Sequence, residues 1–238
     1  MIEIRIHPKI FENHPTFRRG IVIAGNLDNQ GHSPELEDRL NRAIGLAAEK
    51  PIDLKTDPLA TAWNEAHRQF GSNPNKFPPA HCALLKRVQK PGARMPFINK
   101  VVAIMNINSI EARTPVGGDD VIRAGGHLEL RYADGSETFA PLGNPESIEH
   151  PAPGEVIYVV SESKEVMCRR WNWRNGHPTR ITEATRIIVM NIDGLGENSE
   201  TRAVATRDRV ARTIENYCRA EVSTTVLTPE QPVYAFEA

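Results

Sequence analysis

The sequence predicts an α+β fold: a single domain in which a mixed or antiparallel sheet carries helices packed on it. Helical patterns dominate the first half of the chain, and strand patterns dominate the second. The change near residue 115 lacks a linker-like stretch, so residues 1–238 are expected to form one domain. With 238 residues, 39% of them hydrophobic, the chain can bury a substantial core.

The first half opens with two strand patterns. Residues 2–7 alternate apolar and polar side chains, and residues 20–25 are a short apolar run between glycines. Ser33 followed by Pro34 and acidic residues marks a helix start, and the helix is expected to reach about Lys50. Further helices are expected at 59–70, 80–90 and 99–112.

The second half is predicted to be mainly β. Residues 127–132 and 137–140 flank Ala133-Asp134-Gly135-Ser136, a turn sequence that predicts a hairpin. Residues 156–160 and 165–170 predict a second hairpin in the same way. A strand at 186–191, a helix at 199–219 and a strand at 220–227 are expected next, followed by an irregular tail.

Composition narrows the class of protein. The net charge of −1 means that overall charge alone does not make the chain a polyanion binder. Cys82, Cys168 and Cys218 are odd in number and widely spaced, which indicates a reducing compartment without a disulfide framework. The N-terminus lacks a signal-length apolar core and no run approaches membrane-spanning length, so we expect a cytoplasmic protein without a membrane partner.

Charge is unevenly distributed along the chain. No acidic residue occurs from Ala66 to Ile110, whereas this segment holds seven lysines and arginines. A basic segment in a near-neutral protein suits a phosphate-backbone partner, although a solvated helix face is the alternative reading. The candidates for RNA contact in this segment are Lys86, Arg87 and Arg94.

A second basic segment, Cys168 to Gly176, combines three arginines with two tryptophans. Arginine and tryptophan together can stack on bases and pair with phosphates. Strand alternation would put Trp171 and Trp173 on one face, where one of them would anchor the core. The candidates for RNA contact here are Arg169, Arg170 and Arg174, beside Trp173.

Two further segments combine polar residues with a special backbone or an apolar setting. Glycines at Gly117 and Gly118 permit close approach to a ligand. The adjacent carboxylates of Asp119 and Asp120 can bind a metal or act as a base, and the alternative is that at least one of them starts a helix at residues 120–123. The apolar stretch 95–110 contains Asn99, Asn106 and a third asparagine at 108. Amides in an apolar setting need partners, so this stretch carries structural hydrogen bonds or lines a pocket.

Taken in order, these segments resemble the tRNA-binding and editing domain of the bacterial phenylalanyl-tRNA synthetase β-subunit, the B-three/B-four domain family. The likeness is collinear and covers about residues 60–195. Its motifs are FGSNP at 70–74, PPAHCALLKR at 78–87, MPFIN at 95–99, PVGGDD at 115–120, GHLELRYA at 126–133, PGE at 153–155 and WNWR at 171–174, with Thr182 and Thr185.

The resemblance implies a freestanding, trans-acting editing hydrolase in which water attacks the ester of a mischarged aminoacyl-tRNA. Its partner would be the acceptor end of tRNA, not DNA, and neither a metal nor an organic cofactor is implied. Residues 60–195 would form the editing core. A strand and helix would extend it at the N-terminus, and a helix and strand at the C-terminus.

The resemblance also implies roles for single residues. Asn106 falls on the family's pocket asparagine, and with Asn99 it would position the water and stabilise the oxyanion. Gly117 stands where the synthetase domain has a pocket histidine, and Asn191 stands near its tyrosine-recognising glutamate, so tyrosine need not be the substrate. The implied substrate-binding residues are Gly117, Gly118, Asp120, Asn191 and Trp173, and the RNA-binding residues are Lys86, Arg87, Arg94, Arg169, Arg170 and Arg174.

Two other functions remain open at this point. A non-catalytic tRNA- or RNA-binding module is favoured by the missing histidine. A binder or hydrolase of small amino-acid derivatives would need no RNA. The retained asparagine and the Trp-Asn-Trp-Arg segment favour the editing hydrolase.

Overall fold

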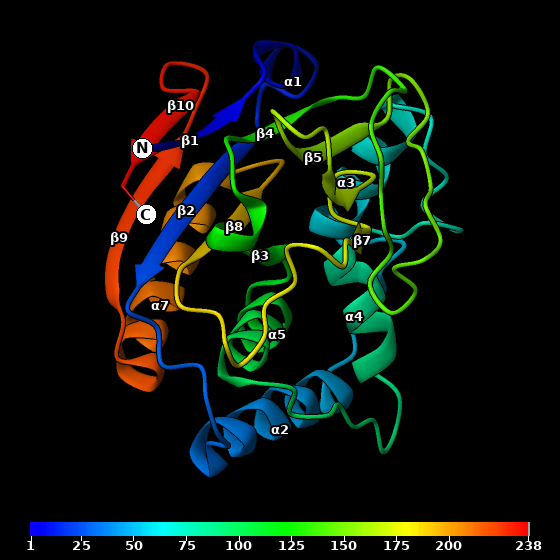
Figure 1. Ribbon diagram of the computed structural model, residues 1–238. Helices are drawn as coiled ribbons and strands as arrows, with labels where there is room; N and C mark the ends of the chain where they lie inside the picture. The colour runs from blue at the N-terminus through cyan, green and yellow to red at the C-terminus, as the bar shows by residue number, and fades with distance from the viewer. Residues whose placement is uncertain (238) are drawn as a thin grey trace.

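Two β-sheets face each other across a hydrophobic core, and a layer of helices covers the outer face of the smaller sheet (Figure 1). The computed structural model describes residues 1–237. The smaller sheet has the strand order β3-β8-β2-β9, and the larger has the order β10-β1-β4-β5-β6-β7. This arrangement confirms the predicted α+β fold with mixed and antiparallel sheets. The strands of the smaller sheet are β2 (Arg18–Gly25), β3 (Val116–Asp120), β8 (Ile188–Gly194) and β9 (Glu221–Leu227).

The central strands of the smaller sheet, β2 and β8, are buried on both faces. Ile21 and Ile23 of β2 belong to the core between the sheets, whereas Val22 and Ala24 pack toward the helices. This alternation explains why β2 and β8 read as continuous apolar runs. The covering helices are α2 (Pro34–Glu49), α4 (Ala80–Val88), α5 (Lys100–Ala112) and α7 (Ser199–Cys218).

The larger sheet joins both ends of the described chain. Ile2 pairs with Phe236, so the two ends lie side by side at one sheet edge (Figure 1). Only β1 and β4 pair in parallel within this sheet. Its strands are β1 (Ile2–Ile6), β4 (Leu128–Tyr132), β5 (Val156–Val160), β6 (Val166–Arg169), β7 (Arg174–Asn175) and β10 (Val233–Phe236).

Three of the predicted helices, α2, α3 (Pro58–Gln69) and α5, begin at residues whose side chains cap them. The Ser33 hydroxyl accepts a hydrogen bond from the backbone N–H of Leu36 and begins α2. The Asp57 carboxylate accepts hydrogen bonds from the N–H groups of Leu59 and Ala60, which begins α3. Each cap satisfies helix donors that would otherwise lack partners.

The structure corrects one of the two predicted hairpins. β4 pairs with β1 and β5, and residues 137–140 form only isolated bridges, such as Phe139 to Glu149. The Glu137 carboxylate accepts hydrogen bonds from Asp134 and Gly135, which closes a turn in place of a second strand. Phe139 is instead buried against the outer face of β5 and β6. The hairpin of β5 and β6 is confirmed.

Several short elements were not predicted. Helix α1 (Pro8–Asn13) and strand β3 are among them, whereas α6 (Val121–Ala124) agrees with the helix start expected at Asp120. The tail is not irregular, because β10 pairs with β1. Within residues 1–237, no helix combines the length and apolar character needed to cross a membrane.

An aromatic cluster fills one end of the core between the sheets. Trp63 of α3 and Trp171 pack edge to face with ring centroids 5.1 Å apart, and Phe17 lies 5.0 Å from Trp171. The ring of His14 lies 4.8 Å from Trp171, and His67 packs nearby against Phe70. Burial lowers the pKa of His14 and of His67 to about 4, so both imidazoles are neutral in the folded protein.

These buried histidines predict that the protein loses stability in mild acid. In the unfolded chain each histidine regains its ordinary pKa of 6.5, so below pH 6.5 the unfolded state binds more protons. The free energy of unfolding should fall by about 2 kcal/mol per such histidine between pH 7 and pH 5. Asp119, whose folded pKa is raised to about 6, acts in the opposite direction over the same range.

Urea unfolding at several pH values measures this dependence. His67→Gln should flatten the pH dependence of the unfolding free energy, whereas His32→Gln, at an exposed position, should leave it unchanged. An equal pH dependence in wild type and His67→Gln would contradict the assignment of His67 as a buried neutral group.

Candidate functional site

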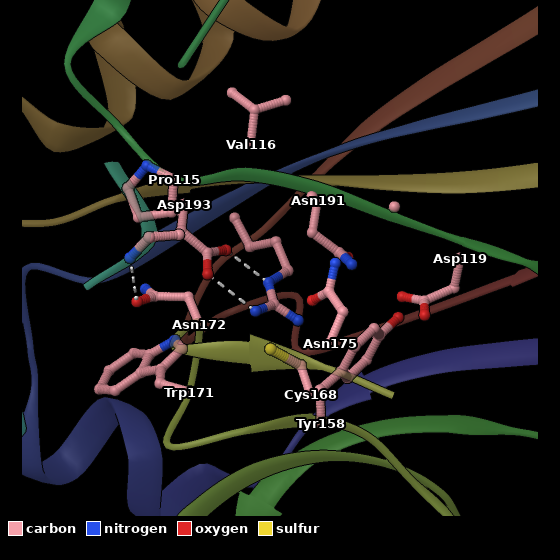
Figure 2. Close-up of a pocket in the computed structure, with 14 residues that line it drawn as sticks. Pro115, Val116, Asp119, Tyr158, Cys168, Trp171, Asn172, Asn175, Asn191 and Asp193 are labelled. Atoms are coloured by element: carbon pink, nitrogen blue, oxygen red, sulfur yellow. Dashed lines mark hydrogen bonds and ion pairs between the residues drawn. The ribbon is translucent and has the colours of Figure 1, made fainter. Parts of the chain in front are cut away.

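A polar pocket lies between the two sheets, where β3, β8 and β2 face β5 and β6 (Figure 2). Its cavity of about 70 Å³ can hold several water molecules or a small polar group, since one water needs roughly 10–15 Å³ by the same measure. It opens beside Asn175, which is exposed. The lining residues are Arg19, Ala80, Pro115, Val116, Gly117, Gly118, Asp119, Tyr158, Cys168, Trp171, Asn172, Asn175, Asn191 and Asp193.

Strand pairing explains why these side chains meet. Arg19 of β2 is the cross-strand partner of Asp193 in β8, and Gly117 of β3 is the partner of Asn191. Side chains two residues apart on a strand share a face, so Asp119 joins them on the inner face of the sheet. The larger sheet closes the pocket from the opposite side.

Arg19 and Asp193 form a buried ion pair at the centre of the site. Arg19 donates from Nε to Asp193 Oδ1 over 2.6 Å and from Nη2 to Oδ2 over 2.9 Å. Burial opposes the charge on Arg19, but Asp193 more than offsets it and raises the pKa of Arg19 above its ordinary value. The guanidinium also lies 4.9 Å from the ring centroid of Tyr158.

Five buried polar atoms of residues that line the pocket lack a hydrogen-bond partner among residues 1–237: Arg19 Nη1, Tyr158 Oη, Trp171 Nε1, Asn172 Nδ2 and Asn191 Oδ1. Burial raises the pKa of Tyr158 well above its ordinary value, so its hydroxyl keeps its proton. Buried polar groups are normally satisfied, and each exception calls for an explanation. Unpartnered N–H and O–H donors together with an amide oxygen acceptor are suited to a ligand that carries both kinds of group.

Asp119 adds an ionisable group to the pocket. Its carboxylate accepts a hydrogen bond of 2.6 Å from the Thr179 hydroxyl and points toward the Tyr158 hydroxyl in the close-up (Figure 2). Burial raises the pKa of Asp119 to about 6, although Thr179 and Arg19 partly oppose the shift. A carboxylate with this pKa is ionised at neutral pH and can accept a proton in a reaction.

Of the two adjacent carboxylates, the sequence favoured Asp120 as the binding residue, whereas the structure places Asp119 in the pocket lining. Asp120 is buried at the start of α6, where its carboxylate accepts a hydrogen bond from the Arg123 N–H. It is therefore a helix cap and does not line the pocket. The alternation Gly117-x-Asp119 would have placed Asp119 in the pocket if residues 116–120 had been read as a strand.

Of the predicted substrate-binding residues, Gly117, Gly118 and Asn191 line the pocket. The predicted catalytic pair lies elsewhere: α5 packs in the helical layer, on the other face of the smaller sheet. Asn99 caps α5 by accepting a hydrogen bond of 3.0 Å from Val102, and Asn106 is half-buried on the same helix. The structure therefore places both asparagines away from the cavity.

The predicted RNA-binding lysine and arginines fall into three groups. Lys86, Arg87 and Arg94 are exposed, and no ion pair engages them in the described part of the chain. Arg169 is instead buried between Glu155 and Glu149, with distances of 2.7 and 2.6 Å, so its charge is neutralised. The remaining two predicted positions, Arg170 and Arg174, lie beside Trp173, outside the pocket lining.

Arg19, Asp193 and Tyr158 are site residues that the sequence reasoning missed. Arg19 lies in the N-terminal segment that was expected only to extend the core. A usable signal existed: Arg19 immediately precedes the apolar run of β2, and Asp193 immediately follows the apolar run of β8. Opposite charges at the adjoining ends of two buried strands suggest a pair.

Other groups in the site have limited chemistry. Burial raises the pKa of Cys168 well above its ordinary value, so its sulfur remains a thiol and is a poor nucleophile. Among residues 1–237, no cluster of three or more His, Cys, Asp or Glu side chains could hold a metal ion. Asp119 can accept a proton, and its polar neighbours in the pocket can donate or accept hydrogen bonds.

Comparison with known proteins gives one family match. A family model described as the B3/4 domain matches residues 62–224, a range that includes most of the pocket but not Arg19. No curated protein matches the chain. Among solved structures, the chain is similar to an N-terminal fragment of the phenylalanyl-tRNA synthetase beta-subunit from Pyrococcus horikoshii, with 13% identity and a TM-score of 0.45. The likeness covers 92% of this chain and 49% of the fragment, so the chain spans about half its length.

The two adjacent glycines of β3 predict different responses to alanine. A Cβ at Gly118 would lie 3.1 Å from the carbonyl oxygen of Val189 and 3.2 Å from Met190 Cγ, whereas a Cβ at Gly117 would meet nothing within 4 Å. Gly118→Ala should therefore lower the free energy of unfolding by about 1–3 kcal/mol. Gly117→Ala should leave it within about 0.5 kcal/mol of wild type. Urea unfolding of the two variants tests this, and equal losses would contradict the described packing of β3.

Proposed function

The chain belongs to the B3/4 domain family, and from this membership we propose that it is a freestanding aminoacyl-tRNA editing hydrolase. The sequence motifs support this proposal through their resemblance to the synthetase editing domain. The observation that carries it is the buried pocket in which Asp119 faces unpartnered polar atoms of Arg19, Tyr158 and Asn191. A buried carboxylate with a raised pKa, placed in a cavity beside hydrogen-bond donors, supports a catalytic role.

In the proposed reaction, water attacks the carbonyl carbon that joins the amino acid to the ribose of the tRNA. Asp119 accepts a proton from the water while the water oxygen bonds to the carbonyl carbon. The Arg19 Nη1 and Tyr158 hydroxyl donors stabilise the negative oxygen that develops on the carbonyl. The carbon–oxygen bond to the ribose then breaks, the ribose oxygen takes the proton, and free amino acid and uncharged tRNA result.

Specificity in this proposal comes from the shape of the pocket. Gly117 leaves space where a side chain would otherwise stand, and Asn191 presents a free amide oxygen opposite it. An amino acid that offers a donor to Asn191 is favoured, because a ligand lacking one leaves a buried acceptor unpaired. Gly117, Gly118 and Asn191 are therefore the proposed substrate-binding residues.

The proposed nucleic-acid partner is the acceptor end of a tRNA. Support comes from Lys86, Arg87 and Arg94, which are exposed on α4 and on the loop after it. Ala80, the first residue of the same helix, lines the pocket. A phosphate backbone held along α4 would thus run close to the reaction site.

Asp119→Asn should abolish hydrolysis while preserving the shape of the pocket. Purified protein is incubated with a panel of correctly and incorrectly charged tRNAs, and the loss of amino acid is followed above the rate in buffer. We expect one class of charged tRNA to lose its amino acid, and Asp119→Asn to slow this by at least about 100-fold. The wild-type rate should fall below about pH 6, because protonated Asp119 cannot act as a base.

Asp38→Asn is the matched control, since Asp38 is exposed on α2 and the chemical change is the same. It should retain the wild-type rate. If no charged tRNA loses its amino acid faster than in buffer, the enzyme proposal fails. If Asp119→Asn is as active as Asp38→Asn, the role of Asp119 fails.

Charge reversal on α4 should weaken tRNA binding. The double substitution Lys86→Glu and Arg87→Glu replaces two exposed cations, so filter binding should show at least tenfold weaker binding at low salt. The same measurement in rising salt should give a shallower slope for the variant than for wild type. Lys9→Glu and Arg212→Glu, which reverse two exposed cations on α1 and α7, provide the control. Wild-type protein that binds no tRNA at any salt concentration would favour the RNA-independent alternative.

A further inference from the structure

We propose that Phe77 and Trp173 form a stacking platform for the nucleobase that ends the tRNA acceptor strand. The proposal deepens the proposed function, because it places the last nucleotide beside the pocket that would hold the aminoacyl group. It rests on the backbone around Trp171, on the cations around the two rings, and on the position of the rings at the pocket rim.

The backbone first separates the two tryptophans. Arg170 and Trp171 both have positive φ angles, 47° and 65°, although neither is glycine. Consecutive left-handed residues cost conformational energy and end β6 at Arg169, so strand alternation no longer holds. Trp171 consequently turns into the core, with 1% of its surface exposed, whereas Trp173 is half-buried at the surface.

Two features hold this turn in place. The Glu155 carboxylate accepts a hydrogen bond of 3.1 Å from the backbone N–H of Arg170. Trp171 is locked by its edge-to-face contacts with Trp63 and Phe17. The packing of Trp171 in the core therefore offsets the cost of the strained backbone. Trp173 stays at the surface and contributes little to the core.

Cations surround the two half-buried rings. Phe77 and Trp173 meet edge to face with centroids 4.7 Å apart. The guanidinium of Arg170 lies 3.9 Å from the Phe77 centroid, and Arg174 lies 5.7 Å from that of Trp173. Lys76, which is exposed, lies 5.1 Å from the Phe77 ring.

The acidic residues nearby balance only part of this charge. Glu155 pairs mainly with the buried Arg169 and reaches Arg170 at 3.8 Å. Glu149 is shared between Arg169 and Arg174. Lys76 has no ion-pair partner within residues 1–237, which leaves a cation for a phosphate at the edge of the platform.

The platform lies at the rim of the pocket. Asn172 and Asn175, on either side of Trp173 in the chain, both line the cavity, as does Ala80, three residues after Phe77. Asn172 Oδ1 also accepts a hydrogen bond from the Ala80 N–H, which ties the two segments together. A base stacked on Trp173 would thus place its ribose near the cavity that holds the ester.

This arrangement fits a nucleotide better than a bare anion or an apolar ligand. Every base has a π-face, and stacking on an aromatic side chain contributes substantially to single-strand binding. Arginine stacked on an aromatic ring offers a second surface of the same kind. A bare phosphate would use the cations but would gain nothing from the rings.

Adenosine 5′-monophosphate is the probe that tests the platform, with ribose 5-phosphate as the same anion without a base. Trp63 and Trp171 are buried, so quenching of tryptophan fluorescence by the nucleotide reports on Trp173. We expect saturable quenching by adenosine 5′-monophosphate and none by ribose 5-phosphate. Calorimetry should show at least tenfold weaker nucleotide binding for Trp173→Leu and for Phe77→Leu.

Tyr234→Leu is the matched control, because Tyr234 is a half-buried aromatic residue on β10, at the opposite end of the larger sheet from β7. It should bind the nucleotide like wild type. Urea unfolding of each variant identifies loss of fold. If only one of Trp173→Leu and Phe77→Leu remains folded, its nucleotide affinity alone tests the platform. Equal binding of the two probes, or wild-type affinity in a folded Trp173→Leu, would overturn the proposal.

The nucleotide-binding test and the deacylation test can reject the platform and the hydrolase independently of each other. Nucleotide binding that depends on Trp173, without hydrolysis of any charged tRNA, would keep the platform and reject the hydrolase. Hydrolysis in a Trp173→Leu variant with an unchanged KM for charged tRNA would keep the hydrolase and reject the platform.

Discussion

The buried ion pair between Arg19 and Asp193 is the interaction on which the site depends. Taking two charges out of water is costly, and the cost is offset only by good geometry and additional contacts. Here the pair is bidentate, and Tyr158 lies against the guanidinium from the opposite sheet. The pair aligns β2 with β8 and still leaves one guanidinium nitrogen pointing at the cavity. The same interaction thus stabilises the pairing of the two strands and holds a hydrogen-bond donor at the cavity.

Local sequence signals predicted the helices well, because their causes are local. Ser33 and Asp57 cap the helices that follow them, and a cap is visible within four residues. Residues 116–120 show the limit of this reasoning, since two glycines and two aspartates have little preference for a strand. They form β3 because β8 lies beside them, and β8 comes about 70 residues later in the chain.

The site was predictable only in part, for the same reason. Resemblance to a family identified Gly117, Gly118 and Asn191 as pocket positions, and these three do line the cavity. It also pointed to asparagines on α5, where the structure shows Asn99 acting as a helix cap. Arg19 lies outside the range matched by the family model, and its partner Asp193 is 174 residues away. Such a pair can be recognised only when the pairing of β2 and β8 is known.

The neighbouring residues Gly117 and Gly118 differ in what constrains them: one lines open cavity space, and the other is packed against its neighbours. Gly118 is constrained by packing, because a Cβ there would lie 3.1 Å from the Val189 carbonyl oxygen and its neighbours would have to shift, whereas Gly117 faces unfilled space. A side chain introduced at Gly117 would therefore enter the cavity and leave the fold nearly unaffected. A single codon change at this position could thus reshape the cavity with little penalty in folding.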